Sequence, residues 1–329
     1  MRRRTGLRQL LITVGAALLA GSSCVWAASA GDYPSRPVRL LLPFAPGGGS
    51  DAVARIITPK LYEALGQQWV VDNRGGASGT IAAGIVAHAE PDGYTVFQGF
   101  STTLTVAPLL YRLPFDVTRD LIPIVTLTAG QYMLVLHPTV KADNLKEFIA
   151  FAKAQPGSLD YASAGLGSPL NLAAELFKAR TGIAMTHVPY KGGGPASLAV
   201  LGGEVQVMFG SLPSVFPHVK AGRLKALAVT GPKRAAVAPR IPTIAESGFP
   251  GFEVTTWYGL MVPAGTPERV RKILHDETAK AMQLPDVKEQ MARQGLEVIV
   301  KGPGQFAAQI RNETAVWAQV IKTAGIKLE

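Results

Sequence analysis

Apolar runs of strand length alternate with amphipathic stretches along much of the chain. Residues 38–43, 69–72 and 95–99 are short, mostly apolar runs that predict strands. Between the first two runs, apolar side chains recur at helical spacing, and Pro59 within that stretch predicts a kink or an interruption of the helix. Strands that alternate with helices in this way are typical of an α/β protein.

The alternation continues beyond a long apolar stretch at residues 124–136, where we expect the chain to pass into a second lobe. At residues 257–262 we expect the chain to return to the first lobe. The predicted organisation is lobe 1 at 31–130 plus 254–329 and lobe 2 at 131–253. Further predicted helices lie at 145–154, capped by Asp143 or Asn144, and at 170–181, 267–282 and 304–323, and further strands lie at 185–188, 207–209 and 224–229.

The first thirty residues have the pattern of an export signal. Residues 1–8 carry four arginines, and the apolar run LLITVGAALLAG and small residues follow. The segment Ala28-Ser29-Ala30 fits a cleavage site, so the mature chain is expected to begin near Gly31. The apolar run is too short to span a bilayer, which predicts a soluble mature protein. The general or twin-arginine export route, and lipidation of Cys24, stay open.

Composition narrows the class of protein. Removing the four arginines of the signal from the net charge of +10 leaves +6 on the mature chain. Its Lys and Arg residues are spread out, with no basic run interleaved with aromatic residues, so we expect no nucleic-acid partner. The single cysteine, Cys24, lies in the signal, which leaves the mature chain without a disulfide or a thiol nucleophile.

The segment PFAPGGGSD at residues 43–51 joins the first predicted strand to the first helix and predicts an anion site. Its glycines allow close backbone approach, and the free N–H groups at the helix start favour a carboxylate or a phosphate. Ser50 and Asp51 are candidate caps. The glycine-rich loop at 73–79 is expected to form a second wall. The segment PYKGGGPA at 189–196 resembles the first loop, because in both a proline and an aromatic residue precede three glycines. This similarity agrees with two lobes that present similar loops.

The main alternative is a nucleotide-dependent α/β oxidoreductase. Gly47, Gly49 and Ala52 follow a strand and open a helix, and Asp72 ends the next strand at the spacing of a dinucleotide-binding fingerprint. The prolines of this loop and the exported compartment argue against that reading. No serine lies in a G-x-S-x-G segment, and the five histidines are scattered singly, so we expect no catalytic residue, no metal site and no cofactor.

Several segments, taken in order, resemble the Bug family of extracytoplasmic receptors of tripartite tricarboxylate transporters. The matching segments are YPSRPVRLLLPFAPGGGSDAVAR, VVDNRGGASG, PDGYT, LAAELFKARTG, HVPYKGGGPA, LGGEVQVMF, KAGRLKALAVT, PTIAESGFPGF and VPAGTPE. The resemblance implies a type II periplasmic-binding-protein fold, with two Rossmann-like lobes and a ligand cleft between them. It also implies a monomeric periplasmic receptor, not an enzyme, that binds a small carboxylate and serves a membrane permease or a sensor protein.

The resemblance also implies a set of ligand-binding residues. Three positions depart from the family pattern: Gly75 stands where proline is common, Asn171 where histidine is frequent, and Gly210 where an acidic residue is frequent. These departures bear on which ligand is bound. The implied first-lobe residues are Phe44, Pro46, Gly47, Gly48, Ser50, Asp51, Ser78, Ser101 and Thr102, and the implied second-lobe residues are Ser163, Gly165, Ser168, Asn171 and Tyr190.

Overall fold

The computed structural model describes residues 33–324, so the predicted signal, its cleavage site and Cys24 lie outside the described residues. Its strands, in chain order, are β1 (Val38–Leu42), β2 (Trp69–Asn73), β3 (Thr95–Phe100), β4 (Leu121–Leu136), β5 (Asp160–Ser163), β6 (Thr186–Pro189), β7 (Val207–Ser211), β8 (Lys225–Val229), β9 (Thr255–Pro263) and β10 (Leu296–Val298). Its longer helices are α1 (Gly49–Leu65), α2 (Thr80–Ala87), α6 (Leu145–Ala154), α7 (Pro169–Thr181), α8 (Gly193–Leu201), α9 (Leu212–Lys220), α10 (Glu268–Gln283), α11 (Pro285–Arg293) and α12 (Pro303–Ala324). Short helical turns are η1 (Ala77–Gly79), α3 (Ser101–Thr105), α4 (Ala107–Leu110) and α5 (Val117–Asp120).

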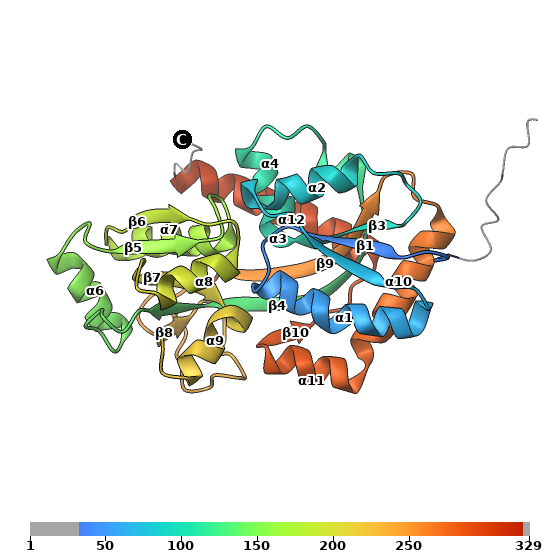
Figure 1. Cartoon of the computed structure of the whole chain (residues 1–329). Coiled ribbons are helices and arrows are strands. Elements are labelled where there is room, and N and C mark those ends of the chain that lie inside the picture. The colour runs from blue at the N-terminus through green and yellow to red at the C-terminus, as the bar shows by residue number, and fades with distance from the viewer. Residues whose placement is uncertain (1–32, 325–329) are drawn as a thin grey trace, which may run out of the picture. The chain divides into compact units, whose positions relative to one another are not determined.

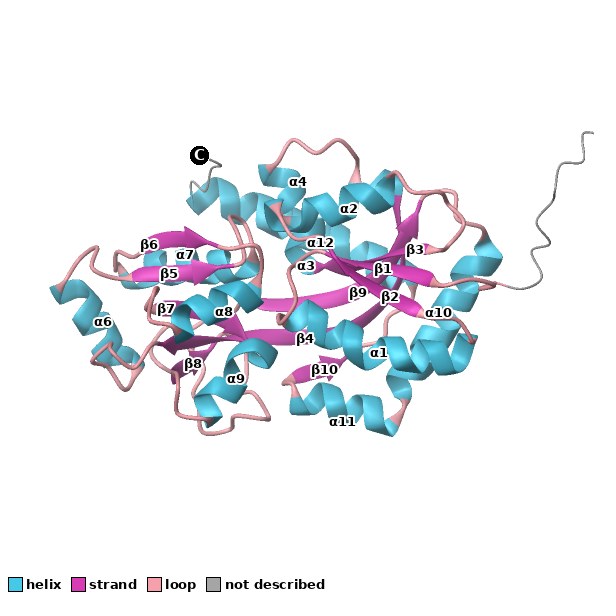
Figure 2. Ribbon diagram, in the orientation of Figure 1, coloured by secondary structure: helices cyan, strands magenta, loops and turns pink. Residues whose placement is uncertain are grey.

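The strands pair in the order β2-β1-β3-β9-β4-β7-β5-β6, and β10 and β8 add to β4 (Figures 1 and 2). In one half β1 pairs in parallel with β2 and β3, and in the other half β5 pairs in parallel with β6 and β7. The long strand β4 joins the halves, because residues 121–131 pair with β9 and residues 132–136 pair with β7. This α/β arrangement agrees with the predicted fold class.

Most of the predicted elements are confirmed, but α1 differs from its prediction in two respects, the interruption at Pro59 and the cap. Pro59 does not interrupt this helix, which runs from Gly49 to Leu65. Pro59 and Arg55, four residues earlier, are both exposed, so the carbonyl that loses its donor can bind water while the buried face stays packed. Ser50 and Asp51 do not cap the helix. They lie in its first turn, and Gly48 occupies the capping position.

One predicted helix cap is confirmed, and a buried tryptophan joins β9 to helix α12. Asn144 caps α6 by accepting a hydrogen bond from Glu147 N at 2.9 Å. Trp257 is buried, packs edge-on against Phe306 with ring centroids 5.2 Å apart, and donates its indole N–H to Glu313. The role of Trp257 is therefore core packing in β9, against helix α12.

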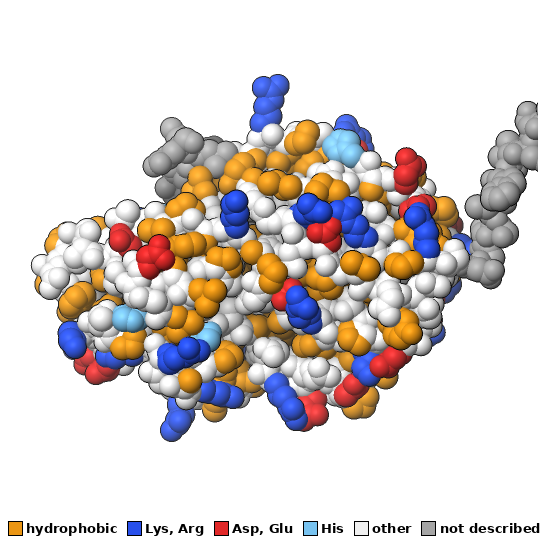
Figure 3. Space-filling model, in the orientation of Figure 1, with side chains coloured by type: hydrophobic (Ala, Val, Ile, Leu, Met, Phe, Trp, Pro, Cys, Tyr) orange, Lys and Arg blue, Asp and Glu red, His pale blue; other side chains and the backbone are white. Residues whose placement is uncertain are grey.

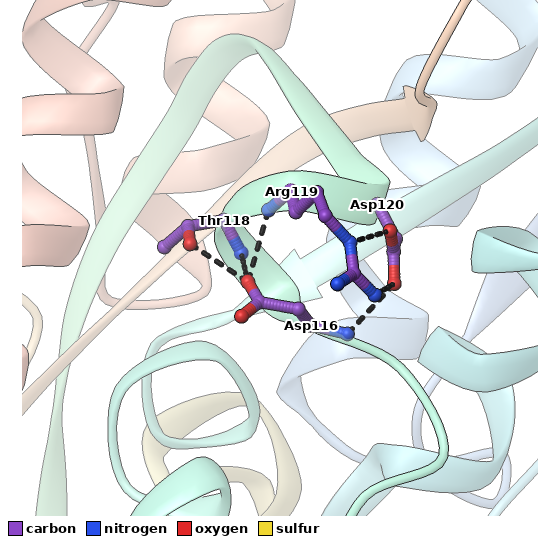
Figure 4. A network of polar contacts seen from close by, with 4 residues as sticks. All are labelled: Asp116, Thr118, Arg119 and Asp120. Carbon is purple, nitrogen blue, oxygen red and sulfur yellow. Dashed lines mark hydrogen bonds and ion pairs between the residues drawn. The ribbon is translucent and has the colours of Figure 1, made fainter.

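A compact polar network fixes the start of β4 (Figure 4). Asp116 caps α5 by accepting from Thr118 N at 2.8 Å and Arg119 N at 3.0 Å. The Arg119 guanidinium pairs with Asp120 at 2.7 Å, and Asp120 also accepts from Asp116 N. The guanidinium and this N–H lower the pKa of Asp120 to about 2. The strand shared by both halves thus starts from a defined, charge-paired turn.

Lys and Arg side chains are distributed over the face drawn in Figure 3 and do not gather into one stripe. Within residues 33–324, no helix combines the length and the apolar character that crossing a membrane requires.

Candidate ligand-binding site

The carboxyl ends of four strands meet at one small cavity. Phe44 follows β1, Phe100 ends β3, Ala164 follows β5 and Ser211 ends β7, and all four residues line the cavity. In each half the chain order along the sheet reverses here, because β1 lies between β2 and β3, and β5 lies between β6 and β7. Open α/β sheets bind their ligands at such reversal points. The cavity is therefore the candidate binding site.

Helix N-termini surround this cavity. Helices α1, α8 and α9 begin beside it, at Gly49, Gly193 and Leu212, and none of the three has a side-chain cap. Helix α7 begins there too, but Ser168 caps it by accepting from Asn171 N. Uncapped N–H groups and the positive ends of helix dipoles favour an anion. The three uncapped helices therefore make the cavity attractive to a negatively charged group.

The cavity lining carries no ionisable acidic or basic side chain. Besides the residues named above, its walls contain Gly48, Ser50, Tyr132, Leu170 and Tyr258. An anion held here would therefore be neutralised by N–H and O–H donors and not by a lysine or arginine. Donors of this kind, fixed in a site that excludes water, can hold a carboxylate through charge-assisted hydrogen bonds.

Two buried tyrosine hydroxyls lie in this lining. Tyr132 Oη is buried and makes no hydrogen bond, although it lies close to Thr256, whose hydroxyl pairs with Ser101 Oγ at 3.1 Å. Burial and the neighbouring Tyr258 raise the pKa of Tyr132 well above its usual value, and burial raises the pKa of Tyr258 as well. Both hydroxyls therefore stay protonated and can donate hydrogen bonds.

The two sides of the cavity are in contact across it. Ala45 N donates to Lys191 O at 3.0 Å, Tyr111 Oη donates to Leu166 O at 2.8 Å, and Ser78 Oγ donates to the same carbonyl. The cavity that remains is about 20 Å³, on the order of the space that one water molecule needs. A larger ligand therefore requires the lining of the cavity to rearrange.

The residues implied for the first lobe fall into two groups. Phe44, Gly48 and Ser50 line the cavity. The others do not line it. Pro46 and Gly47 pack against Gly194, and Asp51 pairs with Arg55 at 2.8 Å. The Ser78 hydroxyl donates to Leu166 O, and the Ser101 hydroxyl pairs with that of Thr256. The hydroxyl of Thr102 is buried without a partner.

The residues implied for the second lobe form a polar network just behind the cavity wall. Ser163 Oγ lies 2.6 Å from His187 Nε2 and accepts from Gly165 N, while Ser168 caps α7. Asn171 accepts from Gly167 N at 2.9 Å and donates to Tyr161 Oη at 2.7 Å. The hydroxyl of Tyr190 is buried outside this network, and Tyr190 does not line the cavity.

Sequence reasoning missed most of the cavity wall. Phe100 and Ser211 could have been found, since they lie one and two residues beyond the predicted strands 95–99 and 207–209, at their carboxyl ends. Tyr132 and Tyr258 carry no such signal, because each stands inside an apolar run. The lining residues that were not predicted are Gly49, Phe100, Tyr132, Ala164, Pro169, Leu170, Gly193, Ser211 and Tyr258.

A larger cavity of about 540 Å³ lies elsewhere, between the loop after β8 and the α11–β10 segment. None of the predicted site residues lines it. Two of its basic side chains are paired with carboxylates, Lys233 with Glu297 at 3.9 Å and Arg234 with Glu246 at 2.8 Å. This cavity lacks the converging strand ends of the smaller one.

The two glycine-rich loops are similar in sequence, but they do not occupy equivalent places in the two halves of the sheet. The loop at 43–48 joins β1 to α1, whereas the loop at 190–192 joins β6 to α8, and the equivalent of β1 in the other half is β5. The two loops instead pack against each other. A methyl group built on Gly48 would lie 3.8 Å from Gly193 N, and one built on Gly194 would lie 2.1 Å from Pro46 O.

The alternative hypothesis, a nucleotide-dependent oxidoreductase, depends on Asp72 as the acidic residue that binds the ribose. Asp72 forms ion pairs with Arg39 at 2.5 Å and Arg74 at 2.8 Å, and these arginines lower its pKa against the opposing effect of burial. Both carboxylate oxygens of Asp72 thus already accept hydrogen bonds from arginines. Within residues 33–324, no group of three or more His, Cys, Asp or Glu residues could hold a metal ion.

Fold and site together define a solute-binding receptor of the type II periplasmic-binding class, and not an oxidoreductase. Residues 53–326 match the sequence model described as the tripartite tricarboxylate transporter family receptor, and the chain belongs to this family. It is similar to Protein BugT of Bordetella pertussis, with 37% identity over 325 residues that cover 98% of this chain and 99% of BugT. The resemblance to the Bug family is thereby confirmed.

Two solved structures with bound ligands are also similar. R. palustris Rpa4515 with adipate has a TM-score of 0.87 and 35% identity, covering 90% of this chain and 99% of that one. MatC from Rhodopseudomonas palustris with bound malate has a TM-score of 0.83 and 33% identity, covering 88% of this chain and 100% of that one.

The substitution Tyr132→Phe is expected to leave the stability of the unliganded protein unchanged or slightly raised, because it removes a buried hydroxyl without a partner. A hydrogen bond to a charged group contributes about 1.5–3 kcal/mol, so carboxylate affinity should fall at least tenfold. Thermal unfolding and calorimetric titration would measure the two effects.

The substitution Tyr161→Phe is the matched control, because Tyr161 Oη donates to Glu175 at 2.5 Å and accepts from Asn171. It should lower stability by about 1–3 kcal/mol and leave affinity nearly unchanged. Equal affinities of the wild type and the Tyr132→Phe variant would show that the Tyr132 hydroxyl does not contact the ligand.

Proposed function

We propose that the protein is an exported receptor that captures a small carboxylic acid in an interlobe cleft and delivers it to a membrane permease or a sensor protein. The observation that carries this proposal is the meeting of three uncapped helix N-termini and two buried tyrosine hydroxyls at one cavity whose lining contains no Asp, Glu, Lys, Arg or His side chain. The adipate and malate of the two related structures support a carboxylate as the ligand.

Binding by lobe closure accounts for the small cavity. We take the lobes as residues 31–130 plus 254–329 and residues 131–253, since β4 changes partners between Gln131 and Tyr132 and β9 begins at Thr255. The contacts across the cavity, such as Ala45 N to Lys191 O, would form only in the closed state. A ligand shifts the population toward closure because it contacts both lobes there.

We infer that binding occurs without chemical turnover. The two serines that line the cavity are held by neutral groups. Ser50 Oγ accepts from Gln98 Nε2 at 2.9 Å, and Ser211 Oγ lies 2.9 Å from Ser214 Oγ. A catalytic serine instead needs an adjacent base to take its proton.

The proposed location is the periplasm, with the signal cleaved near Ala30, and the proposed partner is the permease of a tripartite tricarboxylate transporter or a sensor protein. Family membership and the basic, apolar start of the chain support both statements. We propose a monomer, because ligand capture by two lobes of one chain requires no second copy.

The test is a thermal-shift screen of small carboxylates and NAD on the purified protein, with mass spectrometry of any molecule that co-purifies with it. We expect stabilisation by at least one carboxylate and none by NAD. Because ligand at one hundred times its Kd adds about 2.7 kcal/mol to folding stability, the shift should be several degrees. Stabilisation by NAD alone, or by neither, would contradict the proposal.

A further inference from the structure

We infer, on the basis of the proposed function, that the cleft selects a monocarboxylate with an apolar body, preferably aromatic, over dicarboxylates, tricarboxylates and amino acids. The proposal rests on where the donors of the cavity lie and on what covers the rest of its wall.

The polar groups of the cavity converge on one point. A methyl group built on Gly49 would lie 2.3 Å from Tyr258 Oη and 3.4 Å from Ser211 Oγ, so these groups lie together at the start of α1. The start of α8 joins them, because Gly193 N lies close to Gly48. Tyr132 stands opposite Ser211 in the β4–β7 pair and adds its unpartnered hydroxyl. Donors gathered at one point suit one carboxylate.

The remaining wall is apolar and largely aromatic. The rings of Phe44 and Phe100 meet edge to face with centroids 5.0 Å apart, and Phe100 contacts Tyr258 with centroids 5.2 Å apart. Pro169 and Leu170 cover the opposite side. A second carboxylate placed against this wall would lose its hydration without gaining a partner, which is costly. An aromatic body could instead pack against the rings.

No Asp, Glu, Lys, Arg or His side chain lines the cavity, so a second ionised group on the ligand would have no charged partner in this wall. Asp51 and Arg55 pair with each other at 2.8 Å and do not line the cavity. Gly210 adjoins the lining residue Ser211, but a methyl group built on Gly210 would lie 2.2 Å from Val215 Cγ1. The space for an acidic side chain is therefore filled, and an ammonium group on the ligand would find no carboxylate there.

The experiment compares matched pairs of acids by calorimetric titration of the full exported protein after dialysis at neutral pH. Hexanoate and adipate differ by one terminal carboxylate, as do benzoate and terephthalate, and hexanamide and benzamide remove the charge. We expect each monocarboxylate to bind at least tenfold more tightly than its dicarboxylate and its amide. The variant Phe100→Leu should weaken benzoate more than hexanoate, because it removes a ring but keeps an apolar side chain.

The outcomes separate this inference from the proposed function. Binding of adipate, terephthalate or malate as tight as that of the monocarboxylates would overturn the inference and leave a carboxylate receptor. Equal losses for benzoate and hexanoate in the Phe100→Leu variant would overturn the aromatic preference. Absence of binding by every acid, mono- or dicarboxylic, would overturn the proposed function itself.

Discussion

The substitution Gly194→Ala is expected to weaken ligand binding by ten- to a hundredfold while the protein stays folded. A methyl group built on Gly194 would lie 2.1 Å from Pro46 O and 3.1 Å from Pro46 C, both backbone atoms of the opposite side of the cleft. Overpacking of this kind costs about 1–3 kcal/mol, and here the cost falls only on the closed state. An open conformation without this contact accommodates the methyl group, so the population able to close on a ligand decreases.

The controls must account for the neighbouring proline. Gly194 precedes Pro195, and a residue before proline is disfavoured in the helical region, so alanine at this position carries a local cost in both states. We therefore compare Pro195→Ala alone with Gly194→Ala made in the same Pro195→Ala background. The substitution Gly202→Ala at the other end of α8, where a methyl group makes ordinary contacts at 3.5 Å, controls for the change of residue type.

The expected readouts are calorimetric affinity for the acid that stabilises the wild type most, and thermal unfolding without ligand. The Pro195→Ala and Gly202→Ala variants should bind like the wild type, and the double variant should bind at least tenfold more weakly at unchanged stability. If the double variant binds as tightly as Pro195→Ala alone, the approach of α8 to the loop at Pro46 is not part of the bound state.

The local pattern of the sequence was enough to predict most elements and one loop of the candidate site. Strands such as β1 and helices such as α6 are defined by the spacing of apolar residues and by a cap, and both signals lie within a few residues. The glycine-rich loop after β1 indicated an anion site because close approach and free N–H groups are local properties. Phe44, Gly48 and Ser50 of that loop do line the cavity.

The rest of the wall depends on pairing between distant strands. Tyr132 and Tyr258 meet at one cavity only because β4 pairs with β9 along its first part and with β7 beyond it, which no single segment encodes. Hydroxyl residues also cap helices and pair with other side chains, and the sequence does not distinguish these structural roles from ligand binding. Ser168 caps α7, and Ser101 pairs with Thr256, so a serine beside the cleft need not face it.

The substitution Gly210→Asp, which introduces the acid frequent in relatives, is expected to destabilise the protein severely and not to create affinity for amino acids. Gly210 is buried in β7, and the Cβ of any side chain there would lie 2.2 Å from Val215 Cγ1 in α9. Overpacking costs about 1–3 kcal/mol, and an unpaired buried charge adds about 3–5 kcal/mol. The sum is a large part of the stability of a typical domain, so thermal unfolding should shift down by ten degrees or more.

A double-mutant cycle with Gly210→Ala and Val215→Ala isolates the steric part of this effect. Each single substitution should destabilise, the first by overpacking and the second by leaving a cavity. Together they should cost less than their sum, by about 0.5–3 kcal/mol, because the new methyl group occupies the space that the valine vacates. Additive losses would mean that α9 moves aside freely, and the absence of an acid at Gly210 would then need a cause other than Val215. Favourable coupling would show that the packing of α9 against Gly210 leaves no room for an acidic side chain at this position.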